Sequence, residues 1–219
     1  MIFALFASFI VFCLWLAYEI KKSRRKERQR EQSFWELEEK ANATRRKSLE
    51  NLDYITLPSG ILSMAEHAEQ NFGNDAAIFS RARECFDILN SLSSLKIVNF
   101  TGLTNTELKL EYGAPNITLL TEYDQNYTLL VRTLQTLAEE SYKAGLFPQA
   151  EEILEFAVST GTDVRQSYFL LADLYVRNGR PEKIEELIAA ADSLNTVMKS
   201  TIVRTLKESG PYSGLLRSL

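Results

Sequence analysis

Histidine and cysteine are scarce in this 219-residue chain. His67 is the only histidine, which excludes a histidine-based metal site or a catalytic triad. Cys13 and Cys85 lie far apart in the sequence, so they form neither a CxxC metal motif nor a disulfide framework. A glycine-rich phosphate loop is also missing. The sequence therefore predicts a protein that is not an enzyme and that uses no metal or other cofactor.

Charge is unevenly distributed along the chain. Up to Glu50 the sequence carries 11 Lys and Arg against 7 Glu, and from Asn51 onward it carries 14 against 22 acidic residues. The N-terminal part is therefore basic and the rest is acidic, which predicts different partners for the two parts. Because the main chain body is acidic, nucleic acid is not expected as a partner.

An uncharged, mostly apolar run extends from Ile2 to Tyr18. As a helix it would cover roughly 26 Å, at the short end of a membrane span. Basic residues follow the run rather than precede it, which is typical of an uncleaved anchor with a cytoplasmic body. We expect a single-pass anchor over residues 1–20, with the N-terminus outside. The basic residues expected to contact lipid headgroups are Lys21, Lys22, Arg24, Arg25, Lys26, Arg28 and Arg30.

Residues 21–50 lack proline and glycine, which favours a continuous charged helical stalk. Phe34, Trp35 and Leu37 interrupt its polarity, and they either pack on the body or pair with a second copy of the chain. In the apolar run, Ala4 and Ser8 form a small-xxx-small pair that could bring two helices together. A homo-oligomer is therefore left open.

Residues 51–130 are expected to form a helical N-terminal cap region. Leu49–Leu62 is expected to hold a short helix and then a turn, and Thr104 with Glu107 forms a capping box before another helix. Between them, residues 96–101 have a β-like composition, but no second strand is available to pair with them. We therefore expect a connector there.

Residues 131–196 contain an internal repeat. Ala138 and Ala172, Gly145 and Gly179, Leu154 and Ile188, and Ala157 and Ala191 are each 34 residues apart. This period is typical of a helix-turn-helix solenoid unit. The glycines suit the left-handed position that closes a helix, and the alanines suit close helix crossings.

This stretch resembles the tetratricopeptide repeat (TPR), over two units and under a third of the chain. Departures from the family pattern are Ser141, Ile184, and Thr162 with Thr196 in place of the terminal prolines. The resemblance implies an all-α, TPR-like helical-hairpin solenoid. Because two units do not bury a solenoid core alone, residues 51–130 and a last helix over 197–208 are expected to cap it, followed by a tail over 209–219.

In such repeats the first helix of each pair lines a concave surface that binds ligands. The predicted partner-binding residues here are Arg132, Gln135, Glu139, Tyr142, Lys143, Gln166, Phe169, Asp173 and Arg177. Some members of the family clamp a carboxylate at these places, but acidic Glu139 and Asp173 would repel one. A basic or amphipathic protein segment is the expected partner. A solvated face without a ligand is an equally weighted alternative.

The sequence thus predicts a membrane-anchored scaffold that docks a partner protein at the cytoplasmic face of a membrane. The alternative is a subunit of a membrane complex assembled through its anchor and stalk. An enzyme of unrecognised type is the third interpretation.

Overall fold

The computed structural model describes residues 2–73 and 75–208, with the side chains of residues 2–8 and 11 excepted. Every regular element in these residues is helical, which confirms the all-α class. Contacts divide the chain into two units, one of residues 1–48 with 104–117 and one of residues 49–103 with 118–219. The expected tail, residues 209–219, and the Ala4–Ser8 pair lie outside the described residues.

The first unit combines the long helix α1 (Ile2–Asn42) with α5 (Asn105–Tyr112) and the short 3-10 helix η2 (Ala114–Asn116). The Thr104 side chain caps α5 and Glu107 bonds back to the Thr104 amide, so the predicted capping box is confirmed. Glu38 of α1 accepts a 2.6 Å hydrogen bond from the Thr106 hydroxyl and pairs with Lys109. These bonds join the C-terminal part of α1 to α5.

Buried Asn116 holds the segment that follows α1. Its Oδ1 accepts a 2.8 Å bond from Nε of Arg46, and its Nδ2 donates to the carbonyls of Lys47 and Tyr112, each at 2.8 Å. One carboxamide therefore joins residues that are far apart in the sequence. All its polar atoms are used, as burial requires.

The expected membrane anchor over residues 1–20 is not supported. Among the described residues, none of the helices combines the length and the apolar character needed to cross a bilayer. The uncharged run of α1 ends at Tyr18, and Glu19, Lys21 and Lys22 follow at once on the same helix. The predicted single-pass topology, with the N-terminus outside and a cytoplasmic body, is corrected accordingly. Residues 21–42 of the predicted stalk continue α1 as one helix, whereas residues 43–50 are not helical.

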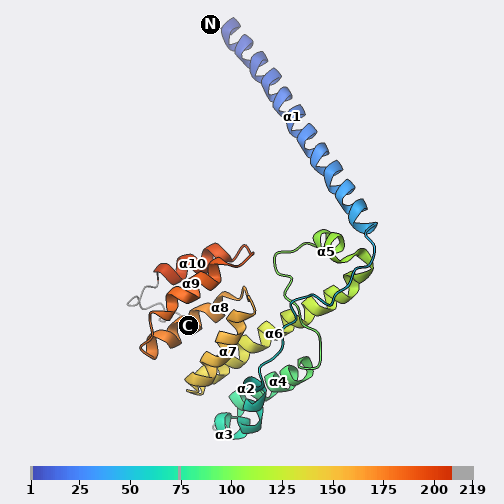
Figure 1. The fold of residues 1–219 in the computed structure, drawn as a ribbon. Helices are drawn as coiled ribbons and strands as arrows, with labels where there is room; N and C mark the ends of the chain where they lie inside the picture. The colour runs from blue at the N-terminus through green and yellow to red at the C-terminus, as the bar shows by residue number, and fades with distance from the viewer. Residues whose placement is uncertain (1, 74, 209–219) are drawn as a thin grey trace. The chain divides into compact units, whose positions relative to one another are not determined.

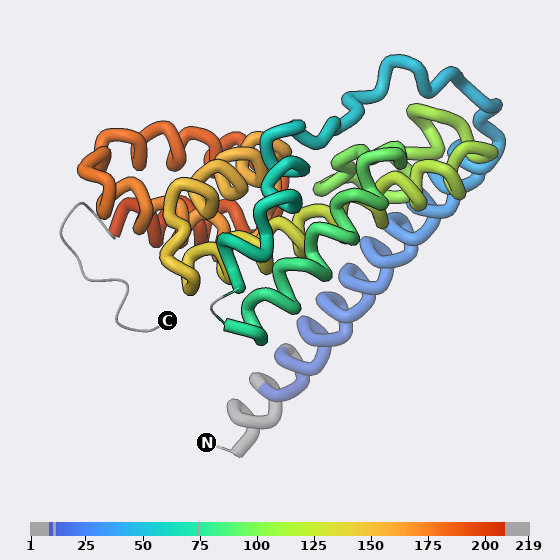
Figure 2. The backbone as a smooth tube through the Cα atoms, turned by 90° about the horizontal axis from the view of Figure 1, so that it is seen from below, coloured from blue at the N-terminus to red at the C-terminus, as the bar shows by residue number. Residues whose placement is uncertain are grey.

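The second unit begins with an extended segment, which three short helices follow. The short helix predicted at the start of Leu49–Leu62 is absent, because residues 49–58 are not helical. The helices are α2 (Ser59–Ser63), η1 (Met64–His67) and α3 (Ala68–Phe72). Figure 2 shows them returning alongside α4 (Ala76–Leu92). Asp75 caps α4, because its Oδ1 accepts the amides of Ala77 and Ile78 at 2.8 and 3.1 Å. Residues 96–100 form the expected connector rather than a strand.

The helices that follow form the rest of the second unit (Figure 1). They are α6 (Ile117–Lys143), α7 (Phe147–Ser159), α8 (Arg165–Arg177), α9 (Lys183–Asp192) and α10 (Lys199–Glu208). Contacts run from α7 to α8, from α8 to α9, and from α10 to both α8 and α9. Helix α6 starts 14 residues before Val131, so it crosses the predicted boundary between cap and repeats.

Both repeat glycines have the expected left-handed backbone, with φ of 77° at Gly145 and 68° at Gly179. Each follows the first helix of a hairpin, α6 or α8. The small residues Ala138, Ala150 and Ala157 are fully buried, as close helix packing requires. Gly145 therefore lies between α6 and α7, and Gly179 between α8 and α9.

One hydrophobic core extends through the second unit, from Leu57 to Leu206. Its largest fully buried side chains include Tyr168, Leu134, Leu137 and Leu154. On α10, Ile202 and Leu206 are buried, so the last helix is amphipathic as predicted. The core fixes α6, α8 and α10 against their neighbours and so positions the surface described next.

Candidate functional site

The predicted partner-binding residues lie on two helices of the second unit, α6 and α8. Along α6, Asp124, Thr128, Arg132, Gln135 and Glu139 recur at three- and four-residue spacing and therefore share one side of the helix. Tyr142 continues this row. The α6–α8 face is defined here as this side of α6 together with the residues of α8 that bond to it.

Direct hydrogen bonds join α6 to α8. The Ser167 hydroxyl donates a 2.6 Å bond to Oε1 of Gln135, and the Tyr142 hydroxyl donates a 2.6 Å bond to Oδ2 of Asp173. Gln135 also donates to Glu139 at 2.8 Å. Because the partners increase together along both helices, α6 and α8 run parallel, as expected for first helices of successive repeats.

Burial separates the predicted residues into two groups. Gln135 and Asp173 are only 8% and 5% exposed and serve as bridges between the helices. Arg132 and Arg177 are exposed, whereas Glu139, Gln166 and Phe169 are half-buried. The prediction that Asp173 presents a repelling charge to a ligand is therefore not supported by its position. A partner would meet Arg132, Glu139, Gln166, Phe169 and Arg177 instead.

Arg177, the last residue of α8, also bonds to α6. It donates a 3.0 Å hydrogen bond to the Tyr142 hydroxyl and lies 5.4 Å from the centre of the Tyr142 ring and 4.6 Å from that of Phe147. Burial raises the pKa of Tyr142, and its hydrogen bond to Asp173 acts in the same direction. Tyr142 therefore stays a neutral donor to Asp173.

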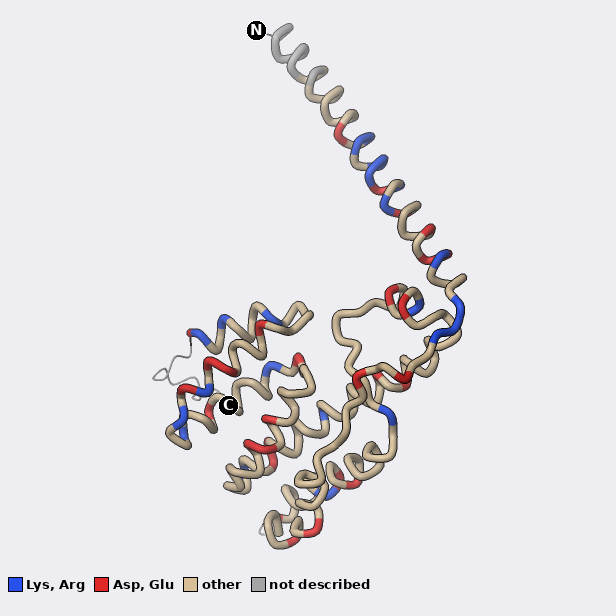
Figure 3. Tube along the Cα trace, in the orientation of Figure 1, with Lys and Arg blue, Asp and Glu red and all other residues tan. Residues whose placement is uncertain are grey.

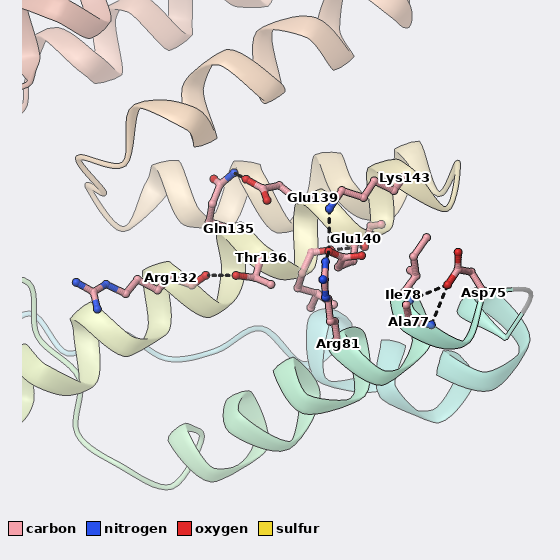
Figure 4. Close-up of polar contacts among 12 residues, drawn as sticks. Asp75, Ala77, Ile78, Arg81, Arg132, Gln135, Thr136, Glu139, Glu140 and Lys143 are labelled. Carbon is pink, nitrogen blue, oxygen red and sulfur yellow. Dashed lines mark hydrogen bonds and ion pairs between the residues drawn. The ribbon is translucent and has the colours of Figure 1, made fainter. Parts of the chain in front are cut away.

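Lys143 departs from the predicted face. Its Nζ lies 2.9 Å from Oε1 of Glu140, whose carboxylate also accepts a 3.2 Å bond from Arg81 of α4. Figure 4 shows Arg81 and Lys143 converging on Glu140, while Gln135 and Glu139 bond to each other on another side of α6. Glu140 is 2% exposed, so this three-residue contact fastens α4 to α6. The ammonium group of Lys143 therefore pairs with Glu140 rather than with residues of the α6–α8 face.

A pocket of about 420 Å³ opens at the N-terminal end of the α6–α8 face. This volume lies within the range of ligand sites. Sequence reasoning included Arg132 among the binding residues but missed the pocket. Its apolar walls are Phe100, Leu103, Val131 and Val164, and its charged groups are Asp124, Arg132 and Asp163. The three- and four-residue spacing from Glu139 back to Asp124 could have indicated that Asp124 lies on the same side of the helix as Arg132.

The wall formed by residues 99–103 is held by Asn99. Its Nδ2 lies 3.0 Å from the Tyr127 hydroxyl and 2.9 Å from the Thr160 carbonyl, and its Oδ1 accepts the Thr101 amide at 2.8 Å. Gly102 has a φ of 86°, and a Cβ there would lie 2.2 Å from the Asn195 carbonyl. Only glycine therefore fits this close approach.

The electrostatics of the pocket are set by its two carboxylates. Burial raises the pKa of Asp124, against a hydrogen bond from the Phe100 amide that lowers it. Burial also raises the pKa of Tyr127 to about 12, and the negative charges of Asp163 and Asp124 add to this rise. Asp124 and Asp163 therefore both act on the phenol of Tyr127, which also lines the pocket.

The seven basic residues assigned to lipid headgroups lie on α1 of the first unit. Figure 3 shows them as a dense basic stretch along this helix, and all are exposed. Lys22 pairs with Glu19 of the preceding turn at 3.4 Å. Their contact with a lipid surface stays a prediction that the fold does not test.

Metal chemistry finds no candidate in the part of the chain described, since no three His, Cys, Asp or Glu side chains there converge on one point. His67 is exposed at the end of η1. The chain matches no protein-family model, no curated protein and no solved structure. The TPR resemblance therefore rests on the repeated residues and the paired helices alone.

Proposed function

We propose that this protein is a docking module whose TPR-like hairpins hold a segment of another protein along the α6–α8 face. The observation that carries the proposal is that buried bridging residues and accessible residues lie side by side on this face. Gln135 and Asp173 are buried in bridges that fix α6 against α8, and Arg132, Phe169 and Arg177 remain accessible beside them. Such a surface favours binding, because its helices are already fixed and few side chains lose freedom when a partner binds.

The accessible groups favour an amphipathic segment. Phe169 and the exposed Val176 of α8 provide apolar contact area, and cationic and anionic groups alternate around them. Because Asp173 is buried and accepts a hydrogen bond from Tyr142, it contributes less repulsion at the surface than its sequence position suggests. A helical or extended segment with apolar anchors and mixed charge suits this face.

Selection from a random-peptide display library on the purified full chain tests this proposal. We expect enrichment of related peptides whose affinity falls roughly tenfold or more in Phe169→Ser and Arg132→Gln. Glu152→Gln and Glu185→Gln change exposed residues on the second helices α7 and α9 and serve as matched controls. Peptides that bind all four variants alike, or a library that yields no peptide, would contradict the proposal.

The runner-up function is assembly through α1. It is favoured by Phe34, Trp35 and Leu37, which are 52%, 61% and 44% exposed on this helix. Large exposed apolar side chains close together often mark a protein interface. Sedimentation equilibrium distinguishes the two: a subunit that assembles through α1 would lose its oligomers in Trp35→Ser with Leu37→Ser, whereas peptide docking would be unchanged.

A further inference from the structure

The pocket at the end of the α6–α8 face combines apolar walls with carboxylates that lack a counter-ion. Phe100, Leu103 and Val164 supply apolar surface, and Asp124 and Asp163 supply negative charge. Within residues 2–73 and 75–208, neither carboxylate forms an ion pair. Their bonding partners are neutral, the Phe100 amide for Asp124 and the Thr196 hydroxyl for Asp163.

The arginine that lines the same pocket is placed away from Asp124. Arg132 follows Asp124 by eight residues on α6, a separation of about 12 Å along the helix axis. It too forms no ion pair within the described residues. Among the described residues, Asp124, Asp163 and Arg132 therefore line the pocket without an ion pair.

These features match one kind of side chain. Lysine and arginine have an apolar stem that packs on apolar surface and a cationic head that seeks carboxylates. A neutral apolar side chain would desolvate Asp124 and Asp163 without supplying a cationic partner, and an anionic one would be repelled by both. Charge complementarity thus selects among the occupants that the cavity could hold.

We infer that this pocket binds an arginine or lysine side chain of the docked segment, with the stem against Phe100 and Leu103 and the head between Asp124 and Asp163. The inference rests on the proposed docking function and names the residue type that anchors the partner. Arg132, at the opposite edge, then favours an acidic residue next to the anchor in the partner's sequence.

A small-molecule titration tests the pocket without knowledge of the partner. The isotope-labelled full chain is titrated with Nα-acetyl-arginine methylamide, and with the norleucine analogue as the uncharged control, while amide resonances are followed by NMR. We expect saturable shifts at Gly102, Thr128 and Val164 with a dissociation constant on the order of 1 mM. The norleucine probe should bind at least about tenfold more weakly.

The carboxylates are tested by the double variant Asp124→Asn, Asp163→Asn, whose fold is checked by circular dichroism. It should lose about tenfold or more in affinity for the arginine probe. Glu122→Gln alters an exposed residue of α6 outside the pocket and should leave the affinity unchanged. Equal binding of both probes, or full affinity in the double variant, would overturn the inference.

The outcomes separate this inference from the proposed function. If library peptides bind the α6–α8 face without preference for arginine or lysine and are insensitive to the double variant, the pocket inference is overturned and docking stands. If the arginine probe binds as expected but no peptide is selected, the cation site is supported and the docking function is contradicted.

Discussion

Asn99 and Tyr127 meet through a hydrogen bond of 3.0 Å from the carboxamide nitrogen to the phenol oxygen, across 28 residues of sequence. The Tyr127 hydroxyl in turn donates to the Thr160 carbonyl at 3.2 Å, and Asn99 donates to the same carbonyl at 2.9 Å. Three segments are therefore joined at one point: the connector after α4, helix α6 and the turn between α7 and α8. This contact holds the wall of the pocket.

Replacing Asn99 should destabilise the second unit. Asn99→Ala removes bonds to Tyr127, Thr160 and Thr101 and leaves the Thr101 amide without its acceptor, which should cost about 2 kcal/mol of unfolding free energy. Urea unfolding followed by circular dichroism measures the loss. Asn90→Ala, at an exposed position of α4, is the control and should have little effect. Equal stability of the two variants would show that the contact at Asn99 contributes nothing.

The ion pair between Arg81 and Glu140 should show measurable coupling. Glu140 is 2% exposed, and removing its charge leaves Arg81 without the partner that joins α4 to α6. A double-mutant cycle with Arg81→Met and Glu140→Gln should give a coupling energy of about 1 kcal/mol. The exposed pair of Arg204 and Glu208, 4.0 Å apart, is the control and should give a value near zero. A coupling energy near zero for Arg81 and Glu140 would show that this ion pair does not stabilise the packing of α4 on α6.

Asp173 should behave as a structural residue rather than as a ligand contact. Asp173→Asn weakens the bond from Tyr142 and should lower stability by about 1–2 kcal/mol, with peptide affinity nearly unchanged. Arg132→Gln should show the opposite pattern, because Arg132 is exposed. Thermal unfolding and peptide binding measured on both variants decide this. Loss of affinity at full stability in Asp173→Asn would restore Asp173 as a binding residue.

The two cysteines should differ sharply in reactivity. Burial raises the pKa of Cys85 to about 11, so below pH 9 almost no thiolate forms there, and the side chain is only 5% exposed. Cys13 is exposed on α1. A thiol reagent at pH 8 should therefore label one site rapidly in the native protein and none in Cys13→Ser. Rapid labelling of Cys85 would show that its surroundings are open to solvent.

Asp124 should lower stability at neutral pH. Its pKa is raised in the folded state, so the stability linked to its proton is present at low pH and lost as pH rises through the folded pKa. Asp124→Asn, which keeps an acceptor for the Phe100 amide, should stabilise the protein at pH 7 by on the order of 0.5 kcal/mol, a value reduced for partial solvation. The gain should vanish in acid. Asp87→Asn, at an exposed position of α4, should show no such dependence.

Local patterns in the sequence predicted much of the second unit. The spacing of Gly145 and Gly179 correctly placed two left-handed helix ends, because positive φ is a local property for which glycine is favoured. The three- and four-residue spacing of Ala82, Phe86 and Leu89 is a similarly local pattern, and these residues line the buried side of α4. Helix α6 begins at Ile117, before the predicted repeat boundary at Val131, and Asn126 on it donates to the Lys96 carbonyl of the connector, a contact that periodicity does not reveal.

The features that were missed depend on residues distant in sequence. Asp173 is buried by Tyr142, 31 residues away, and Gly102 is required by the carbonyl of Asn195. The pocket forms where residues 100–103, one side of α6 and residues 163–164 meet, so a single helix pattern could not predict it. Composition alone predicted a membrane span in the apolar run before Glu19. Charged residues follow Tyr18 directly on the same helix, and among the described residues no helix is long and apolar enough to cross a bilayer.

Photocrosslinking tests the α6–α8 face most directly. A benzoylphenylalanine is placed at Phe169 on the face, and in a second protein at Leu129, which is 44% exposed on α6 but lies off the face. Each is irradiated with the same library-selected peptide. We predict a crosslink from position 169 that Arg132→Gln diminishes, and none from position 129. Equal crosslinking from both positions, or crosslinking from 129 alone, would contradict docking at this face.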